Sequence, residues 1–267
     1  MFWVNGQPAS TISLSDRSFQ YGDGCFTTIL TKQGKLIRWD LHLERMQACL
    51  QRLGITQPNW QQVSEWLNLA SLDEPYAGLK LHISRGSGGR GYSSKGIDTP
   101  TVTVSHFSYP QHYFSWKKEG VQLGVCELKL GLMPLLAGHK HNNRLEQVLL
   151  KQELEQSGLQ DGVVMDINNH VVETTMANLF WIKQDILYTP SLSNCGVAGI
   201  IRKTVLAQAK LFNITTVVDD FYFEHLQSAE EVFMTNAIIG VAPVTRIDNF
   251  HFSIGAFTRR IQESLNS

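Results

Sequence analysis

One lysine and one acidic residue have surroundings that suggest chemistry. Lys140 lies in an irregular, glycine-bearing stretch directly before a predicted helix, and not on a charged helix face. Glu173 is the only acid in residues 171–180, a stretch that is otherwise uncharged and rich in β-forming side chains. Most lysines are solvated, and a buried carboxylate needs a partner, which is commonly a cation of the same chain. A protonated heterocyclic nitrogen is the functional alternative for that partner.

A glycine-rich segment, residues 86–91, follows a predicted strand and matches the G-x-G-x-x-G pattern of dinucleotide-binding folds. That fold requires a helix next, whereas residues 92–96 lead into another strand. The segment is therefore either a flexible hairpin loop or a substrate-binding loop. In the second interpretation Arg85 and Arg90 present planar guanidinium groups to a carboxylate, and the glycines allow it to approach the backbone closely.

A helix predicted to begin near Gly199 offers unpaired backbone N–H groups to an anion. Thr235, Asn236 and Ala237 follow a β-forming run and could add donors to the same anion. Helix starts are common, so this pattern alone is weak. The two histidines that flank Lys140 have no cysteine or carboxylate pair nearby, and we expect no metal site.

The composition excludes several classes of protein. The 267 residues are 43% hydrophobic, and 23 Lys and Arg against 24 Asp and Glu give a net charge of −1. A nucleic-acid-binding protein usually has a basic excess, which is missing here. The N-terminus does not have the pattern of a signal peptide, and residues 131–137 are too short to span a membrane. Four dispersed cysteines favour a reducing compartment, so we expect a cytoplasmic protein.

The elements that must position these residues predict an α+β fold with two lobes. Short strands joined by turns outnumber helices, and regular strand–helix–strand alternation is missing, which favours mixed or antiparallel sheets with flanking helices. We expect a small N-terminal domain over 1–110 and a larger C-terminal domain over 111–267. Three helix features are expected: an N-cap at Asp40, a helix start near Asn59, and one face formed by Leu145, Val148 and Leu149.

Taken in order, six segments make the chain resemble the fold-type IV pyridoxal-phosphate enzymes, and among them the aminodeoxychorismate lyases. No single segment is decisive, but their shared order and spacing are specific and run along nearly the whole chain. The segments are residues 15–28, 42–45, 84–92, 138–147, 173–180 and 196–202.

The resemblance implies a role for each matching residue. Lys140 matches the lysine that forms a Schiff base with pyridoxal 5'-phosphate, and the C-terminal domain is expected to carry it. Glu173 matches the acid that keeps the pyridine nitrogen protonated, and Arg45 matches an arginine that contacts the cofactor phosphate. The backbone that holds the phosphate is matched by Gly199, Ile200, Ile201, Asn236 and Ala237.

The implied activity is conversion of 4-amino-4-deoxychorismate to 4-aminobenzoate and pyruvate, a step of folate biosynthesis. Lys140 would act as the base, and Thr28 would orient the leaving group or the lysine. Arg85 or Arg90, together with Tyr92, would hold a substrate carboxylate. The resemblance also implies a homodimer, with no nucleic-acid or membrane partner.

Two departures separate the chain from branched-chain aminotransferases. Those enzymes usually have a tyrosine where this chain has Leu145 and an acid where it has Thr27. A D-amino-acid or branched-chain aminotransferase on the same scaffold is the alternative enzyme. A cofactor-binding protein without catalysis is a third interpretation, against which the retention of both Lys140 and Glu173 argues, since a carrier needs no protonated electron sink.

Overall fold

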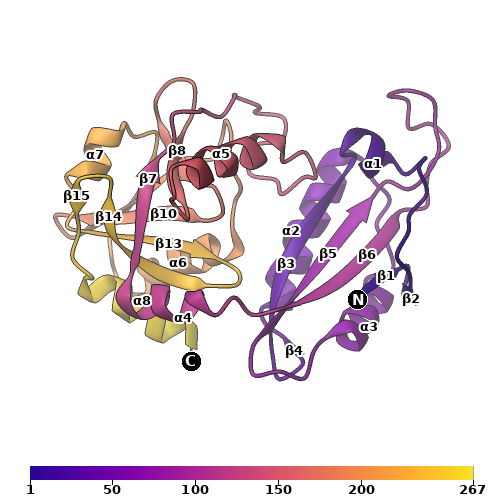
Figure 1. Ribbon diagram of the computed structural model, residues 1–267, viewed down its shortest axis with the longest axis horizontal. Helices are drawn as coiled ribbons and strands as arrows, with labels where there is room; N and C mark the ends of the chain where they lie inside the picture. The colour runs from indigo at the N-terminus through magenta and orange to yellow at the C-terminus, as the bar shows by residue number, and fades with distance from the viewer. Residues whose placement is uncertain (267) are drawn as a thin grey trace. The chain divides into compact units, whose positions relative to one another are not determined.

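Two β-sheets with flanking helices form the protein, whose computed structural model describes residues 1–266 (Figure 1). The chain divides into a first unit, Met1–Tyr109 with His139–Asn143, and a second unit, Pro110–Gly138 with the residues from Arg144 onward. The expected α+β class with mixed and antiparallel sheets is confirmed. The observed division differs from the expected one in one respect: the segment with Lys140 packs with the first unit, because its backbone pairs with a strand there.

The first unit contains a six-stranded antiparallel sheet in the order β2-β1-β6-β5-β3-β4. The strands are β1 (Phe2–Val4), β2 (Gln7–Pro8), β3 (Gly24–Lys32), β4 (Lys35–Leu36), β5 (Ala77–Ser84) and β6 (Thr101–Ser108). The helices are α1 (Arg17–Tyr21), α2 (Trp39–Leu53) and α3 (Trp60–Ala70).

The core of this unit lies between one face of the sheet and helices α2 and α3 (Figure 1). Because side chains alternate along a strand, Cys25 and Ile29 of β3 point into this core, as do Leu79 and Leu81 of β5. Met46 of α2 completes that layer. Side chains between them on the same strands point to the opposite face.

Two helix starts test the sequence patterns. Asn59 caps α3 as expected, since its side chain accepts a hydrogen bond from the Gln62 N–H at 3.1 Å. The prediction that Asp40 is the N-cap of α2 was wrong. The cap is Arg38, in the left-handed conformation, and Asp40 lies in the first turn. An acid in the first turn still interacts favourably with the helix dipole, which explains why the sequence pattern pointed to it.

The second unit contains a nine-stranded mixed sheet in the order β12-β11-β10-β13-β14-β7-β8-β9, with β15 paired to β14. The strands are β7 (Val121–Val125), β8 (Gly162–Met165), β9 (Val171–Thr174), β10 (Asn178–Lys183), β11 (Ile186–Pro190), β12 (Thr216–Asp219), β13 (Glu231–Asn236), β14 (Gly240–Ile247) and β15 (Phe250–His251). The helices are α4 (His112–Glu119), α5 (Leu145–Gln156), α6 (Ile200–Leu211), α7 (Phe223–Gln227) and α8 (Ala256–Asn266).

Helix α5 has two apolar faces, and the core uses the one that the sequence analysis did not select. Leu145, Val148 and Leu149 share a face as expected, but this face is exposed. Leu150 and Leu154 are each 2% exposed and pack in the core instead. Successive residues of a helix are about 100° apart, so the two stripes point in different directions and only packing decides between them.

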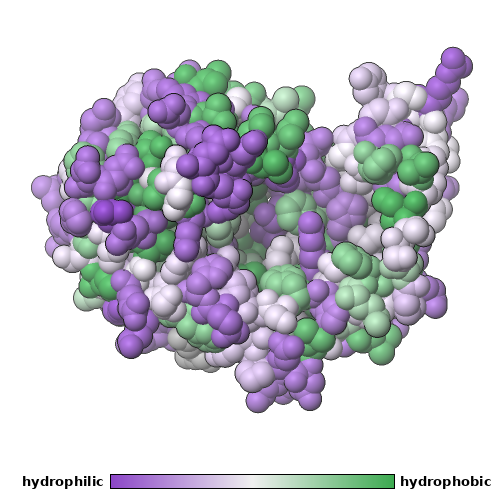
Figure 2. Space-filling model, in the orientation of Figure 1, coloured by the Kyte–Doolittle hydropathy of each residue, from purple (hydrophilic) through white to green (hydrophobic). Residues whose placement is uncertain are grey.

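The surface is mixed in character. On the face shown in Figure 2, hydrophilic and hydrophobic residues are interspersed over each unit. Within residues 1–266, every helix is too short or too polar to cross a membrane.

Candidate functional site

Lys140 is fixed by backbone pairing with the start of β3. The Phe26 N–H donates to the Lys140 carbonyl at 3.0 Å, and the Asn142 N–H donates to the Gly24 carbonyl at 2.9 Å. The Nζ atom of Lys140 lies 4.5 Å from the centre of the Phe26 ring. Gly24 permits this approach, because a Cβ there would lie 2.5 Å from the Asn142 side chain.

A polar network holds Asn142, two positions after Lys140. The Asn142 amide nitrogen lies 2.8 Å from both Ser18 Oγ and His82 Nε2. Burial, reinforced by the charge of Lys80, lowers the pKa of His82 to about 4, so this imidazole is neutral at pH 7. If Nε2 accepts from Asn142, Nδ1 carries the proton and can donate to Thr103 Oγ1 at 3.2 Å.

Arg45 is positioned by α2 on the core face of the same sheet. One of its terminal nitrogens donates to Thr27 Oγ1 at 2.5 Å, and Thr27 Oγ1 lies 2.6 Å from His42 Nδ1. Burial lowers the pKa of Arg45 to about 10, which leaves it charged at pH 7. The buried Nε of Arg45 has no hydrogen-bond acceptor among the described residues. A buried, charged donor of this kind suits an anionic ligand.

Thr28 lies on the other side of the sheet from Thr27, because consecutive residues of a strand alternate. It pairs with Lys80 of β5 and shares a face with Phe26, whose ring contacts Lys140. The structure therefore brings Thr28 and Lys140 to one face of the sheet in the first unit. Arg45 binds Thr27 on the opposite face.

Glu173 is the last residue but one of β9 in the second unit and is 6% exposed. Its Oε2 accepts hydrogen bonds from the Asn178 side-chain amide at 3.2 Å and from the Val197 N–H at 3.1 Å. Burial lowers the pKa of Arg202, and the negative charge of Glu173 opposes that shift, so the two groups interact electrostatically. Glu173 is thus a buried carboxylate that two amides orient and that interacts electrostatically with Arg202.

Asn178 connects Glu173 to the start of α6. Its side chain also donates to the Val197 carbonyl at 2.8 Å and accepts from the Gly199 N–H at 3.1 Å. A Cβ at Gly199 would lie 2.3 Å from the Asn178 oxygen, so only glycine fits there. Sequence reasoning did not select Asn178, although a polar residue at the start of the apolar run 179–182 was a visible signal.

The start of α6 fits an anion such as the cofactor phosphate. Gly199 is the N-cap and supplies no side-chain hydrogen bond, so the first N–H groups, those of Ile200 and Ile201, point out of the helix without a side-chain cap. At the end of β13, the Thr235 hydroxyl is buried and has no partner among the described residues. Next to it, the Asn236 side chain accepts from two N–H groups of the turn that contains Ala237, each at 2.9 Å. An uncapped helix start and a buried hydroxyl without a partner match the needs of a phosphate, and Glu173 matches those of a protonated ring nitrogen.

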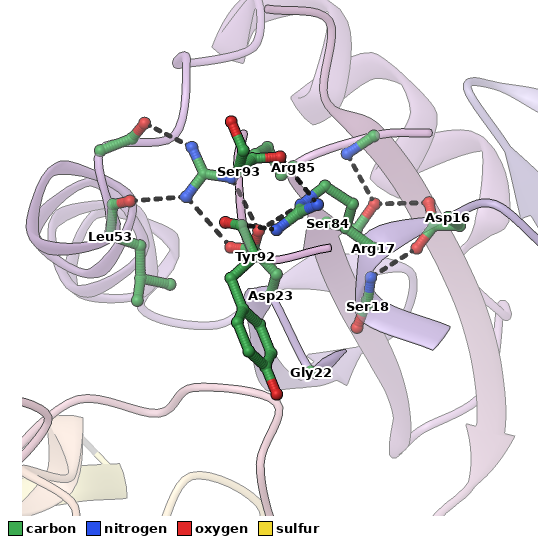
Figure 3. Close-up of polar contacts among 12 residues, drawn as sticks. Asp16, Arg17, Ser18, Gly22, Asp23, Leu53, Ser84, Arg85, Tyr92 and Ser93 are labelled. Atoms are coloured by element: carbon green, nitrogen blue, oxygen red, sulfur yellow. Dashed lines mark hydrogen bonds and ion pairs between the residues drawn. The ribbon is translucent and has the colours of Figure 1, made fainter. Parts of the chain in front are cut away.

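The loop between β5 and β6 (residues 85–100, the β5–β6 loop) contains the predicted substrate residues. Arg85 donates to Asp23 through two nitrogens, at 2.7 and 3.1 Å, and to the carbonyls of Leu53 and Gly54, each at 2.7 Å (Figure 3). These contacts occupy four of its five N–H bonds. Only one N–H bond of Arg85 remains for the predicted contact with substrate.

Arg90 and Tyr92 lie farther along the β5–β6 loop and are exposed; Tyr92 is 91% exposed. The glycine-rich segment connects two antiparallel strands, because β5 and β6 pair along their length. The contact of Arg90 and Tyr92 with substrate stays a prediction. Within residues 1–266, no group of three or more His, Cys, Asp or Glu side chains is arranged to hold a metal ion.

Comparisons with known proteins place the chain in a family. Residues 24–247 match the model of the family described as amino-transferase class IV. The aminodeoxychorismate lyase of Vibrio harveyi is 52% identical, over 100% of both chains.

Two solved structures share the fold. The crystal structure of 4-amino-4-deoxychorismate lyase from Pseudomonas aeruginosa superimposes with a TM-score of 0.92 at 33% identity, covering 100% of this chain and 98% of that one. The branched-chain amino acid aminotransferase of Escherichia coli has a TM-score of 0.85 at 21% identity, covering 99% and 93%. The second likeness shows the fold alone, and the fold therefore does not separate lyases from aminotransferases.

Proposed function

The chain belongs to the class IV aminotransferase family, and from that membership we propose that it is an aminodeoxychorismate lyase that uses pyridoxal 5'-phosphate. It converts 4-amino-4-deoxychorismate to 4-aminobenzoate and pyruvate. The observation that carries this choice of activity is the 52% identity, over the full length, with the lyase of Vibrio harveyi. The aminotransferase compared above, that of Escherichia coli, is only 21% identical.

The residues described above would hold the cofactor. In the second unit, the backbone of Gly199, Ile200 and Ile201 and the turn at Asn236 and Ala237 suit its phosphate, while Glu173 suits its ring nitrogen. In the first unit, Lys140 supplies the amine. Arg45, a buried charged donor on the opposite face of the sheet, is assigned to the phosphate by the family resemblance alone. When bound, the cofactor supplies an electron sink that stabilises negative charge on the carbon next to the substrate amine.

Lys140 acts as the general base of the reaction. Its Nζ takes the proton from C4 of the substrate, and the bond between C3 and the ether oxygen breaks. The ring then becomes aromatic, which provides much of the driving force, and the enolpyruvate that leaves takes up a proton to become pyruvate. Thr28 lies on the face of the sheet that Lys140 shares, where its hydroxyl can orient the leaving group or the lysine amine.

Glu173 keeps a proton on the ring nitrogen throughout. The amides of Asn178 and Val197 orient its carboxylate, and its negative charge favours the protonated form of the ring nitrogen. Arg90, with Tyr92, binds one of the two substrate carboxylates, since a guanidinium group can donate two parallel hydrogen bonds to it. Arg85 contributes mainly by holding the base of the β5–β6 loop.

The proposal extends to the setting of the enzyme. We infer a homodimer that works in folate biosynthesis in the cytoplasm, because the family resemblance implies the first two and the dispersed cysteines favour a reducing compartment. Light scattering of the purified protein measures its mass, and a monomer of 30.1 kDa would contradict the dimer.

A continuous assay tests the activity. Purified protein with bound cofactor is mixed with aminodeoxychorismate, and 4-aminobenzoate formation is recorded together with the visible spectrum of the cofactor. We expect many turnovers with the starting spectrum restored. If no aromatic product forms and an amino donor instead converts the cofactor to its pyridoxamine form, the enzyme is an aminotransferase.

A further inference from the structure

We propose that Arg17 and Asp23 are positioning residues that hold the β5–β6 loop in the conformation that presents Arg90 and Tyr92 to the substrate. This inference rests on the proposed function for the identity of the ligand. The structural claim is that two buried charged groups hold the loop, and it can be tested without measuring enzyme activity.

Asp23 connects the two ends of this arrangement (Figure 3). Its Oδ2 accepts from Arg17 Nε at 2.8 Å and from Arg85 Nε at 2.7 Å, and the three side chains are between 4% and 14% exposed. Burial alone would raise the pKa of Asp23, but the hydrogen bonds and charges of Arg85 and Arg17 outweigh it and lower the pKa. The carboxylate is therefore charged at pH 7 and neutralises one of two buried cations.

Arg17 holds the middle of the loop by its backbone. Its terminal nitrogens donate to the carbonyls of Gly91 at 3.1 Å, Tyr92 at 3.3 Å and Ser93 at 3.3 Å. Three consecutive carbonyls thus converge on one guanidinium group, while the Tyr92 side chain stays in solvent. Arg17 itself is 3% exposed, so the contact fixes the loop from inside.

Arg85 holds the start of the same loop. Its bonds to the Leu53 and Gly54 carbonyls satisfy acceptors at the end of α2, where the helix leaves them unpaired. Through Asp23, the loop is connected at its start and its middle to α1 and α2. No equivalent of this arrangement is needed for a simple hairpin, in which two residues suffice for the turn.

Such contacts matter here because the glycines of the loop make its backbone costly to order. Gly86, Gly88, Gly89 and Gly91 all have positive φ, between 56° and 112°. Each ordered residue costs about 1–2 kcal/mol of backbone entropy, and glycine loses the most. Without the arginine contacts the loop would sample many conformations, and Arg90 would be rarely placed to meet a carboxylate.

Trypsin cleavage measures the order of the loop directly. Arg90 and Lys95 are exposed trypsin sites within it. In the holoenzyme, Arg17→Lys keeps the charge but loses the planar fork, and Asp23→Asn keeps the shape but loses the charge. We expect either change to speed cleavage after Arg90 and Lys95 by about tenfold, because proteolysis follows the population of the open form. Asp98→Asn, at an exposed position of the loop that bonds only to its neighbour Thr99, is the matched control and should leave the rate unchanged.

The kinetic test separates positioning from a general structural role. For Arg17→Lys and Asp23→Asn we expect KM for aminodeoxychorismate to rise about tenfold, with kcat within about twofold of native and an unchanged cofactor spectrum. Native cleavage rates in both variants would overturn the loop contact. Faster cleavage with unchanged KM would overturn the positioning role. If the native protein has no lyase activity but the cleavage result holds, the proposed function fails and the loop contact stands.

Discussion

Asp23 in the first unit and Glu173 in the second are both carboxylates shielded by protein, and their hydrogen-bond donors differ. Asp23 accepts from two guanidinium groups at 2.8 and 2.7 Å. Glu173 accepts from a side-chain amide and a backbone amide, both neutral. Asp23 bonds directly to two guanidinium groups and acts as structural support, whereas the amide bonds at Glu173 orient a negative charge that favours a cationic ligand.

The two units also hold their anion-binding groups differently. The second unit offers an uncapped helix start and a buried threonine hydroxyl, so its donors are part of the fold. The first unit offers Arg45, a long side chain that is kept in place by Thr27. Replacing a side chain leaves the backbone donors in place unless the new residue is proline, and the predictions below therefore act on the side chains that orient or neutralise charge.

The largest effect is expected at Lys140. Lys140→Ala removes the proposed base, and kcat should fall by at least about 10³-fold, within the range for a general base together with covalent attachment. The assay of 4-aminobenzoate formation measures it. Lys35→Ala, at the exposed start of β4 in the same unit, is the control and should be as active as native. Wild-type activity in Lys140→Ala would exclude the assignment.

Glu173→Gln tests the difference between the two carboxylates. The variant keeps the size of the side chain and an oxygen that accepts from Asn178. It loses the negative charge that stabilises the protonated ring nitrogen. We expect kcat to fall about 10²-fold while the cofactor still binds. The same neutralisation at position 23, Asp23→Asn, should act on KM instead. If both variants lowered kcat equally, the proposed difference in role between Asp23 and Glu173 would be wrong.

Asn178→Ala should loosen the cofactor site of the second unit. The change removes three hydrogen bonds to Glu173, Val197 and Gly199, with a cost of about 1–3 kcal/mol. We expect the Kd for the cofactor, measured by absorbance titration, to rise about tenfold. Asn68→Ala, on the exposed side of α3, is the matched control. An unchanged Kd would show that Asn178 does not orient the site.

The smallest effect is a pH dependence of stability that comes from the first unit. Burial, together with Arg45 and Arg38, lowers the pKa of His42 from 6.5 to about 3. The unfolded chain therefore binds the extra proton first, and the contribution of His42 to stability is complete above pH 6.5 and is lost as the pH falls toward 3. We expect about 1 kcal/mol less free energy of unfolding per pH unit in this window.

Urea unfolding between pH 7 and pH 5 measures this slope. In His42→Asn the slope should become shallower, because the group that takes up the proton is removed. His251→Asn, on the exposed strand β15, is the control and should keep the native slope. An identical slope in native protein and His42→Asn would contradict the assignment.

Sequence patterns predicted features that depend on near neighbours. The cap of α3 at Asn59 and the connection between β5 and β6 both involve contacts between residues close in sequence. Lys140 and Glu173 could also be selected as candidates from their segments, and their roles stay predictions. The order of the motifs along the chain was sufficient for the family.

Tertiary structure decided which of several suitable partners each side chain has. Arg85 could bind a substrate, but Asp23 and the end of α2 occupy most of its donors, and these partners are 31 to 62 positions away in the chain. The exposed face of α5 and the pairing of residues 139–143 with β3 were likewise set by packing. Local preferences act over one or two turns of the chain. The sequence by itself therefore determined which residues are candidates for chemistry and which turns surround them. Long-range contacts, which depend on the path of the whole chain, determined which of those residues support the fold and which keep their donors and charges for a ligand.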